Sequence, residues 1–127
     1  MEEYILEPTE KTPAIHLKDG LIVISGRSIP EDPYKIFKST HQWVAGYVKN
    51  PSKHTEINIQ IEYCDTSSTN NIYQILTKLV KCRNSNFNIE MVFNWYFDKD
   101  DDEMLELGKF MESKLNVMFN YFEIEDI

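Results

Sequence analysis

The sequence has few of the residues that build metal sites, disulfide frameworks and nucleotide-binding loops. Its 127 residues include two cysteines, three histidines and four glycines. Cys64 and Cys82 show no C-x-x-C spacing, so we expect neither a disulfide framework nor a zinc site. The histidines are scattered along the chain, and no Gly-rich segment could cradle a phosphate. We therefore expect no metal, no cofactor and no ATP binding.

Basic residues are also scarce relative to acidic ones. The chain has 13 Lys and Arg against 21 Asp and Glu, which gives a net charge of −8. Nucleic-acid binding needs clustered cations, and a negative charge of this size also disfavours anionic lipid surfaces. No segment approaches the ~20 apolar residues of a membrane span, and the N-terminus has no basic and apolar leader. We expect a cytoplasmic protein with no nucleic-acid or membrane partner.

The sequence does contain enough core-forming residues for one compact domain. Hydrophobic residues make up 42% of the chain and aromatic residues 13%. This amount predicts a single domain over residues 1–127. Residues 1–12 mix charges with Pro8 and show little periodicity, so we expect them to be a loosely ordered lead-in.

Hydrophobic periodicity predicts the elements of an α/β domain. Alternating residues indicate strands at 14–17, 21–25, 57–63, 87–97 and 117–124. Asp19-Gly20 is a hairpin turn signal between the first two strands. Three- and four-residue spacing predicts helices that begin near Asp32-Pro33, Thr66 and Asp102. The order ββαβαβαβ predicts a mixed sheet with helices mainly on one face.

The stretch 63–68 is where an alternating strand ends and an amphipathic helix begins. Ser67 or Ser68 can cap the first N–H groups of that helix. Thr66 then lies at a strand-to-helix corner, with an exposed hydroxyl near the positive end of the helix dipole. A phosphate on Thr66 would be favourably placed there.

Three loops should meet at this corner, because the carboxyl ends of parallel strands share one edge of a sheet. These loops are residues 26–32, 65–68 and 98–102. Arg27 is then the expected charge partner of a phosphate on Thr66, whereas Asp65 and Asp98 would repel it.

Several of these segments together resemble one protein family. They are Gly26-Arg27-Ser28-Ile29-Pro30-Glu31, Tyr63-Cys64-Asp65-Thr66-Ser67-Ser68, Asn94-Trp95-Tyr96-Phe97-Asp98, and Trp43. The chain from about residue 13 to its end resembles the SiaC-type bacterial regulatory phosphoproteins. This resemblance implies a STAS-like fold, similar to that of anti-sigma-factor antagonists, and phosphorylation of the threonine that corresponds to Thr66.

The resemblance also implies partners. A dedicated kinase would phosphorylate Thr66 and a PP2C-like phosphatase would restore it. The unmodified form would bind and activate a diguanylate cyclase, within cyclic-di-GMP signalling and biofilm regulation, and would not itself be an enzyme. The expected partner-binding surface around Thr66 consists of Arg27, Ser28, Pro30, Glu31, Asp65, Ser67, Ser68 and Asp98.

Two positions depart from the family pattern. Asp65 stands where the family usually has Asn, and Asp32-Pro33 replaces a commoner Asn-Ala. A carboxylate beside Thr66 makes phosphorylation electrostatically costlier, which tunes the switch toward the unmodified state.

Two other functions remain open from the residues alone. In a constitutive interaction scaffold, Thr66, Ser67 and Ser68 would serve as a helix cap only. A small enzyme would use a Cys64 thiol with a lowered pKa, or divalent ions bound at residues 98–102. We expect instead that Cys64 is a buried strand residue and that the acidic run is a solvated helix N-terminus. The large aromatic residues are expected to pack in the core: Trp43, Phe93, Trp95 and Phe119.

Overall fold

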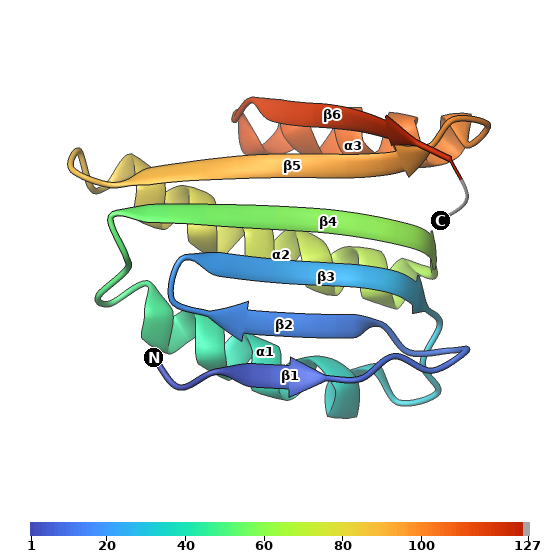
Figure 1. The fold of residues 1–127 in the computed structure, drawn as a ribbon, viewed down its shortest axis with the longest axis horizontal. Coiled ribbons are helices and arrows are strands. Elements are labelled where there is room, and N and C mark those ends of the chain that lie inside the picture. The colour runs from blue at the N-terminus through green and yellow to red at the C-terminus, as the bar shows by residue number, and fades with distance from the viewer. Residues whose placement is uncertain (126–127) are drawn as a thin grey trace.

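A computed structural model describes residues 1–125, which form one six-stranded sheet and three helices. The elements are β1 (Tyr4–Leu6), β2 (Ala14–Lys18), β3 (Leu21–Ser28), α1 (Pro33–Tyr47), β4 (His54–Cys64), α2 (Thr66–Asn84), β5 (Glu90–Asp98), α3 (Asp102–Leu115) and β6 (Phe119–Ile124). The strands lie in the sheet in chain order (Figure 1). The pairs β1–β2 and β2–β3 are antiparallel, and β3 to β6 are parallel.

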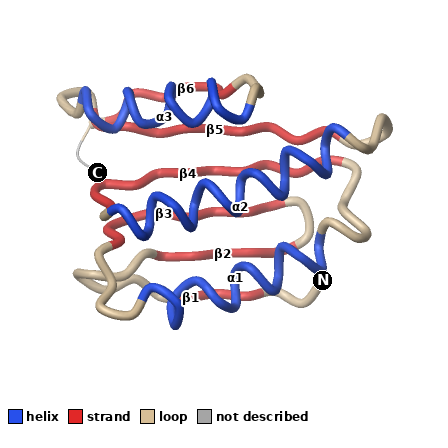
Figure 2. Tube along the Cα trace, turned by 180° about the vertical axis from the view of Figure 1, so that it is seen from behind, coloured by secondary structure: helices blue, strands red, loops and turns tan. Residues whose placement is uncertain are grey.

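All three helices cover the same face of the sheet. Figure 2, which views the sheet from the helix side, shows α1, α2 and α3 side by side across it, with α2 in the middle. Each helix connects two neighbouring parallel strands, and right-handed crossovers in one direction along a sheet place their helices on one side. No helix in the described part of the chain covers the opposite face. The predicted mixed α/β sheet with helices on one face is confirmed.

The core lies between the sheet and the helices. Ile57, Ile59 and Ile61 of β4 are at most 2% exposed, whereas the residues between them are more accessible. They meet Leu76 and Leu79 of α2, which are also buried. Burial of each such side chain contributes about 1.5–3 kcal/mol, so the alternation read from the sequence identifies the main source of stability.

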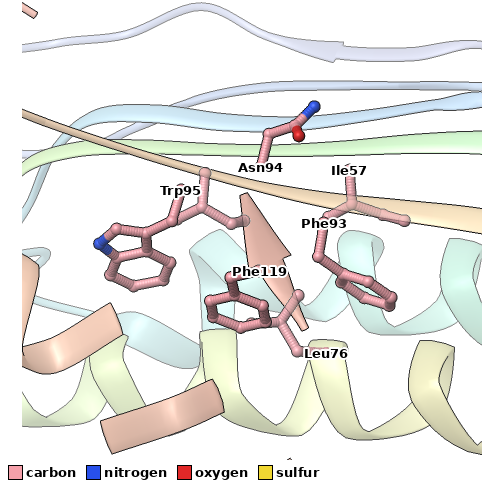
Figure 3. Close-up of a pocket in the computed structure, with 7 residues that line it drawn as sticks. Ile57, Leu76, Phe93, Asn94, Trp95 and Phe119 are labelled. Atoms are coloured by element: carbon pink, nitrogen blue, oxygen red, sulfur yellow. The ribbon is translucent and has the colours of Figure 1, made fainter. Parts of the chain in front are cut away.

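The large aromatic residues pack in this core, as expected. Figure 3 shows Phe93, Trp95 and Phe119 pointing from the sheet toward Leu76 of α2, while Asn94 points to the other face. The rings of Trp95 and Phe119 stack with their centroids 5.8 Å apart. The space between these side chains is part of the core and not a binding cavity.

The expectation for the N-terminal segment is wrong in part. Residues 4–6 are not loose; they form β1, in which Tyr4 pairs with Leu17 of β2. The indole Nε1 of Trp43 in α1 donates a hydrogen bond to the carbonyl of Glu2 at 2.7 Å. This edge strand adds a sixth strand to the five predicted. A strand of three residues is too short to show periodicity, and its contacts come from elements far along the chain.

Most of the local predictions hold. Asp19-Gly20 forms the two-residue turn of the β2–β3 hairpin, with Gly20 at a φ of +84°. The side chain of Asp32 caps α1, and Pro33 is its first residue. Four strand boundaries differ by two or three residues: β3 ends at Ser28 instead of residue 25, β4 begins at His54 instead of residue 57, β5 begins at Glu90 instead of residue 87, and β6 begins at Phe119 instead of residue 117.

Candidate functional site

The three loops expected to converge do so at the carboxyl edge of the parallel strands (Figure 1). The loop after β3 touches the loop after β4, because the amide of Asp65 donates to the carbonyl of Ser28 at 3.0 Å. The loop after β5 lies next to it, since Asp101 and Cys64 line one shallow recess. The predicted meeting point of these loops is confirmed.

The cap of α2 is not the one predicted. Asp65 is the N-cap residue, and its Oδ1 accepts a hydrogen bond from the amide of Ser68 at 2.8 Å. The hydroxyl of Ser67 donates to the same oxygen at 3.3 Å. Asp caps helices as well as Ser does. With Asp65 in this role, Thr66 becomes the first residue of α2.

Ser28 and Ser68 form a buried hydroxyl pair beneath the corner. Both residues are 0% exposed. The hydroxyl of Ser28 donates to Ser68 Oγ at 2.6 Å, and the Ser68 hydroxyl donates to the Ser28 carbonyl at 2.9 Å. Pro30 is buried as well. The side chains of these three residues are therefore not accessible to a partner in this structure, and the two serines hold the end of β3 against the start of α2.

Thr66 differs from the three hydroxyl residues that follow it. It is exposed, and its side chain makes no hydrogen bond to any of residues 1–125. By contrast, Ser67 and Ser68 are engaged as described, and Thr69 Oγ1 donates to the carbonyl of Asp65 at 2.9 Å. The predicted exposed hydroxyl at a strand-to-helix corner is confirmed for Thr66. Glu31 is also exposed, and Asp65, Ser67 and Asp98 are partly exposed.

Arg27 has partners other than the corner hydroxyl. Ser28 faces α2, so Arg27, the preceding strand residue, points toward the uncovered face of the sheet. Its Nε donates to the carbonyl of Glu10 at 3.2 Å, its Nη1 lies 3.6 Å from a carboxylate oxygen of Glu62, and its guanidinium lies 5.6 Å from the ring centre of Tyr63. Pairing with a phosphate on Thr66 stays a prediction, and it would compete with these contacts.

The recess beside the corner is acidic. It has a volume of about 170 Å³, and its lining includes the carboxylates of Glu62, Asp101 and Glu103. Asp101 caps α3 by accepting from the amide of Met104 at 3.0 Å, and Asp98 accepts from the amide of Asp100 at 3.1 Å. Within the described residues, no group of His, Cys, Asp and Glu side chains has a metal-binding arrangement. The acidic run leads into α3, which begins at Asp102 with Asp101 as its N-cap, as expected.

Cys64 is the last residue of β4 and is half-buried, in surroundings that disfavour the thiolate. Burial raises the pKa of its thiol, and the charges of Asp65 and Asp101 raise it further, although the Thr69 hydroxyl acts in the opposite direction. A thiol needs a lowered pKa to react readily near neutral pH. This direction is the reverse of what the small-enzyme alternative requires.

The histidines are not arranged to act as a base for the Cys64 thiol. His16, His41 and His54 bond to Glu3, Asn71 and Glu90 respectively, on different elements. The scattered arrangement expected from the sequence is what the structure contains.

Comparisons with known proteins agree with this geometry. Residues 6–124 match the model of a family described as SiaC family regulatory phosphoproteins. An uncharacterised protein of Pseudomonas aeruginosa (strain UCBPP-PA14) is 24% identical over 111 residues, which cover 86% of each chain.

Two solved structures have the same fold. SiaC of Pseudomonas aeruginosa matches with a TM-score of 0.79 and 23% identity, over 99% of this chain and 100% of that chain. The complex of the diguanylate cyclase SiaD with its activator SiaC, from the same organism, matches with a TM-score of 0.81 and 22% identity, over 97% and 99% of the two chains.

The family model covers almost all of the described chain, and it includes the corner built by Ser28, Asp65 and Thr66. Its description is that of a regulatory protein and not of an enzyme. No helix in residues 1–125 is long and apolar enough to cross a membrane. The chain belongs to the SiaC family of regulatory phosphoproteins.

Proposed function

We propose that this protein is a partner-switching module whose binding to a diguanylate cyclase is controlled by phosphorylation of Thr66. In this proposal the unmodified protein binds and activates the cyclase. Two findings support it: the family consists of regulatory phosphoproteins, and a structure of the same fold is the activator in a complex with the diguanylate cyclase SiaD.

The observation that carries the proposal is the state of the hydroxyl groups at the start of α2. A kinase must bring the acceptor oxygen to a nucleotide phosphate, which requires an accessible hydroxyl. Thr66 is exposed and makes no hydrogen bond within residues 1–125, whereas Ser68 is fully buried. The hydroxyls of Ser67 and Thr69 are bonded to Asp65. Among these four neighbours, Thr66 is therefore the natural acceptor.

The charges around Thr66 explain how a phosphate would act as a switch. A phosphate adds about −1.5 to −2 charges at neutral pH. The helix N-terminus favours an anion by about 0.3–1 kcal/mol, but Asp65 already occupies the Ser68 amide. The recess beside the corner adds the negative charge of Glu62 and Asp101, and Asp98, in the loop after β5, is expected to add to it. A partner that fits the neutral hydroxyl would meet repulsion and a desolvation cost after phosphorylation.

The proposal includes two further enzymes and a revised contact surface. A dedicated kinase adds the phosphate and a PP2C-like phosphatase removes it. The accessible residues of the predicted surface are Arg27, Glu31, Asp65, Ser67 and Asp98, and these frame the contact with partners. Arg27 would leave Glu62 to pair with the phosphate.

A first experiment locates the modification. Intact-mass measurement and phosphopeptide mapping of the protein from its native cells should find phosphate on Thr66. The Thr66→Val variant should lack it. Absence of phosphate under all growth conditions would refute the modification and favour the constitutive scaffold.

A second experiment tests the switch itself. Purified variants are added to the diguanylate cyclase of the same cells, and binding and cyclic-di-GMP synthesis are measured. Thr66→Ala should bind and activate as the wild type does, and Thr66→Glu should do neither. Gln74→Glu is the matched control, because it adds the same charge at an exposed position farther along α2. Equal binding by the Ala and Glu variants of Thr66 would contradict the mechanism.

A further inference from the structure

Two long stretches of this acidic chain contain no carboxylate side chain. Residues 33–55 and 66–89 form α1, α2, the loops after them and the first two residues of β4, and they include none of the 21 Asp and Glu residues. They hold more than half of the 13 cations, namely Lys35, Lys38, Lys49, Lys53, Lys78, Lys81 and Arg83. The remaining chain therefore has six cations and all of the acidic residues.

The fold brings these cations onto one side of the molecule. α1 and α2 lie next to each other on the helix-covered face (Figure 2). Lys35 and Lys38 of α1 and Lys78 and Lys81 of α2 are exposed. Lys35 and Lys38 lie in the first turns of α1, whereas Lys78 and Lys81 lie toward the C-terminal end of α2, where Lys49 and Lys53 follow the end of α1. These residues are far apart in the sequence, and the packing of α1 beside α2 brings the C-terminal group to one end of the surface.

None of these seven cations forms an ion pair within residues 1–125. Elsewhere in the molecule such pairs are present, for example between Lys11 and Glu31 and between Lys99 and Glu125. Lys38 instead lies 5.5 Å from the ring centre of Tyr34, which is itself exposed. The positive charge of α1 and α2 is therefore available to an anionic group from outside the described chain.

A shallow, open groove lies beside the C-terminal end of α2, next to Val48 at the end of α1. It has a volume of about 370 Å³ and is lined by Val48, Lys78, Lys81, Cys82, Ser85 and Asn86. Val48 and Cys82 supply an apolar lining, and the two lysines supply charge. Such a groove can take an apolar side chain while carboxylates on the same segment meet Lys78 and Lys81.

We propose that the α1–α2 surface docks an acidic amphipathic segment of a partner protein, with an apolar side chain in this groove. Charge complementarity identifies the occupant, because the Lys and Arg side chains of α1 and α2 have no acidic neighbours on these helices and form no ion pair within residues 1–125. An apolar lining between lysines suits a polypeptide better than a phosphate backbone. The net charge of −8 also opposes the approach of a long polyanion such as duplex DNA.

The groove lies at the opposite end of α2 from Thr66, whereas Lys35 and Lys38 lie at the start of α1, at the same edge of the sheet as Thr66. The helix has 19 residues, which at 1.5 Å per residue is a length of about 28 Å. Charge effects between exposed groups are screened over about 8–10 Å at physiological ionic strength. Docking is therefore independent of phosphorylation, so that a partner stays attached here while contacts at the corner are made or broken.

The test uses a synthetic fluorescein-labelled helical peptide of glutamate and leucine, with binding followed by fluorescence anisotropy at low salt. A peptide of glutamine and leucine tests the need for charge. Lys78→Glu/Lys81→Glu should weaken binding at least about tenfold, because two attractive pairs become repulsive. Lys109→Glu/Lys114→Glu on α3 makes the same change in net charge and should alter binding less than about twofold. Thermal melts confirm that both variants fold, since all four lysines are exposed.

Several outcomes would overturn the proposal. Equal weakening by the two double variants would mean that only net charge matters. Failure of the wild-type protein to bind the glutamate peptide would also refute the proposal. So would tighter binding of a duplex DNA probe than of the glutamate peptide. Self-association in analytical ultracentrifugation that Lys78→Glu/Lys81→Glu abolishes would identify a second copy as the occupant. Thr66→Glu should leave peptide binding unchanged, and a loss there would refute independence from the switch.

Discussion

Replacing Ser68 by Ala tests whether the buried hydroxyl pair holds the corner together. The Ser68 hydroxyl accepts from Ser28 Oγ at 2.6 Å and donates to the Ser28 carbonyl at 2.9 Å, and both residues are 0% exposed. Ser68→Ala removes both bonds and leaves the Ser28 hydroxyl buried without this partner. The Asp65 amide still donates to the Ser28 carbonyl, so that oxygen keeps one bond.

The size of the effect follows from burial. A net buried hydrogen bond contributes about 0.5–1.5 kcal/mol, and a buried polar group left unpaired costs about 1–3 kcal/mol. We expect Ser68→Ala to lower the free energy of unfolding by about 2–3 kcal/mol. For a domain of this size that corresponds to a fall in Tm of roughly 6–15 °C.

Urea unfolding followed by circular dichroism measures this loss, and a double-mutant cycle with Ser28→Ala isolates the pair. The double variant should be more stable than the sum of the single losses predicts, by about 1 kcal/mol, because no unpaired hydroxyl remains. Ser67→Ala is the matched control, since it removes only a partly exposed bond of 3.3 Å, and it should cost less than about 0.5 kcal/mol. If Ser68→Ala costs no more than Ser67→Ala, the buried pair does not hold β3 to α2.

Three further predictions concern single positions. Asp65→Ala should lower stability by about 1 kcal/mol in urea unfolding, whereas Asp65→Asn keeps the cap and should cost little; equal losses would argue against the cap. Gly108→Ala should lower the free energy of unfolding by about 1–3 kcal/mol, because the new Cβ would lie 2.6 Å from the Trp95 indole. The indole is held in place by its hydrogen bond to the Met104 carbonyl. A gain in stability, which Gly→Ala usually gives in a helix, would contradict this packing. In a Cys82→Ala background, the alkylation rate of Cys64 should rise to half its maximum at a higher pH than in an unfolded cysteine peptide, because its folded pKa is raised. Protonated Cys64 therefore contributes stability below the pKa of the unfolded thiol, and this contribution is lost as pH rises through the folded pKa; a half-maximum at or below the peptide's value would refute the burial argument.

Much of the fold was predictable because its signals are local. The alternating residues of β4, the Asp19-Gly20 turn and the Asp32-Pro33 helix start each depend on neighbours in sequence, and each is confirmed. β1 was missed because three residues carry no periodicity. Its order depends on β2 and on Trp43, which lies far along the chain.

The candidate site was predictable in position but not in detail. Local spacing placed Thr66 at the start of a helix, and the parallel connections placed the loops at one edge. Whether Asp65 or a serine caps the helix could not be decided, because both residue types cap well. The burial of Ser28 and Ser68 depends on the contact between β3 and α2, which only the folded chain brings together.

The segregation of charge between the α1–α2 surface and the rest of the chain makes the charge distribution of the molecule asymmetric. In the field of a charged partner, such a molecule rotates before the two surfaces touch. More encounters then begin in a productive orientation, which raises the association rate constant at low ionic strength and makes it fall as salt is added. In the proposed switch, the same rotation would also set the direction from which the cyclase reaches Thr66.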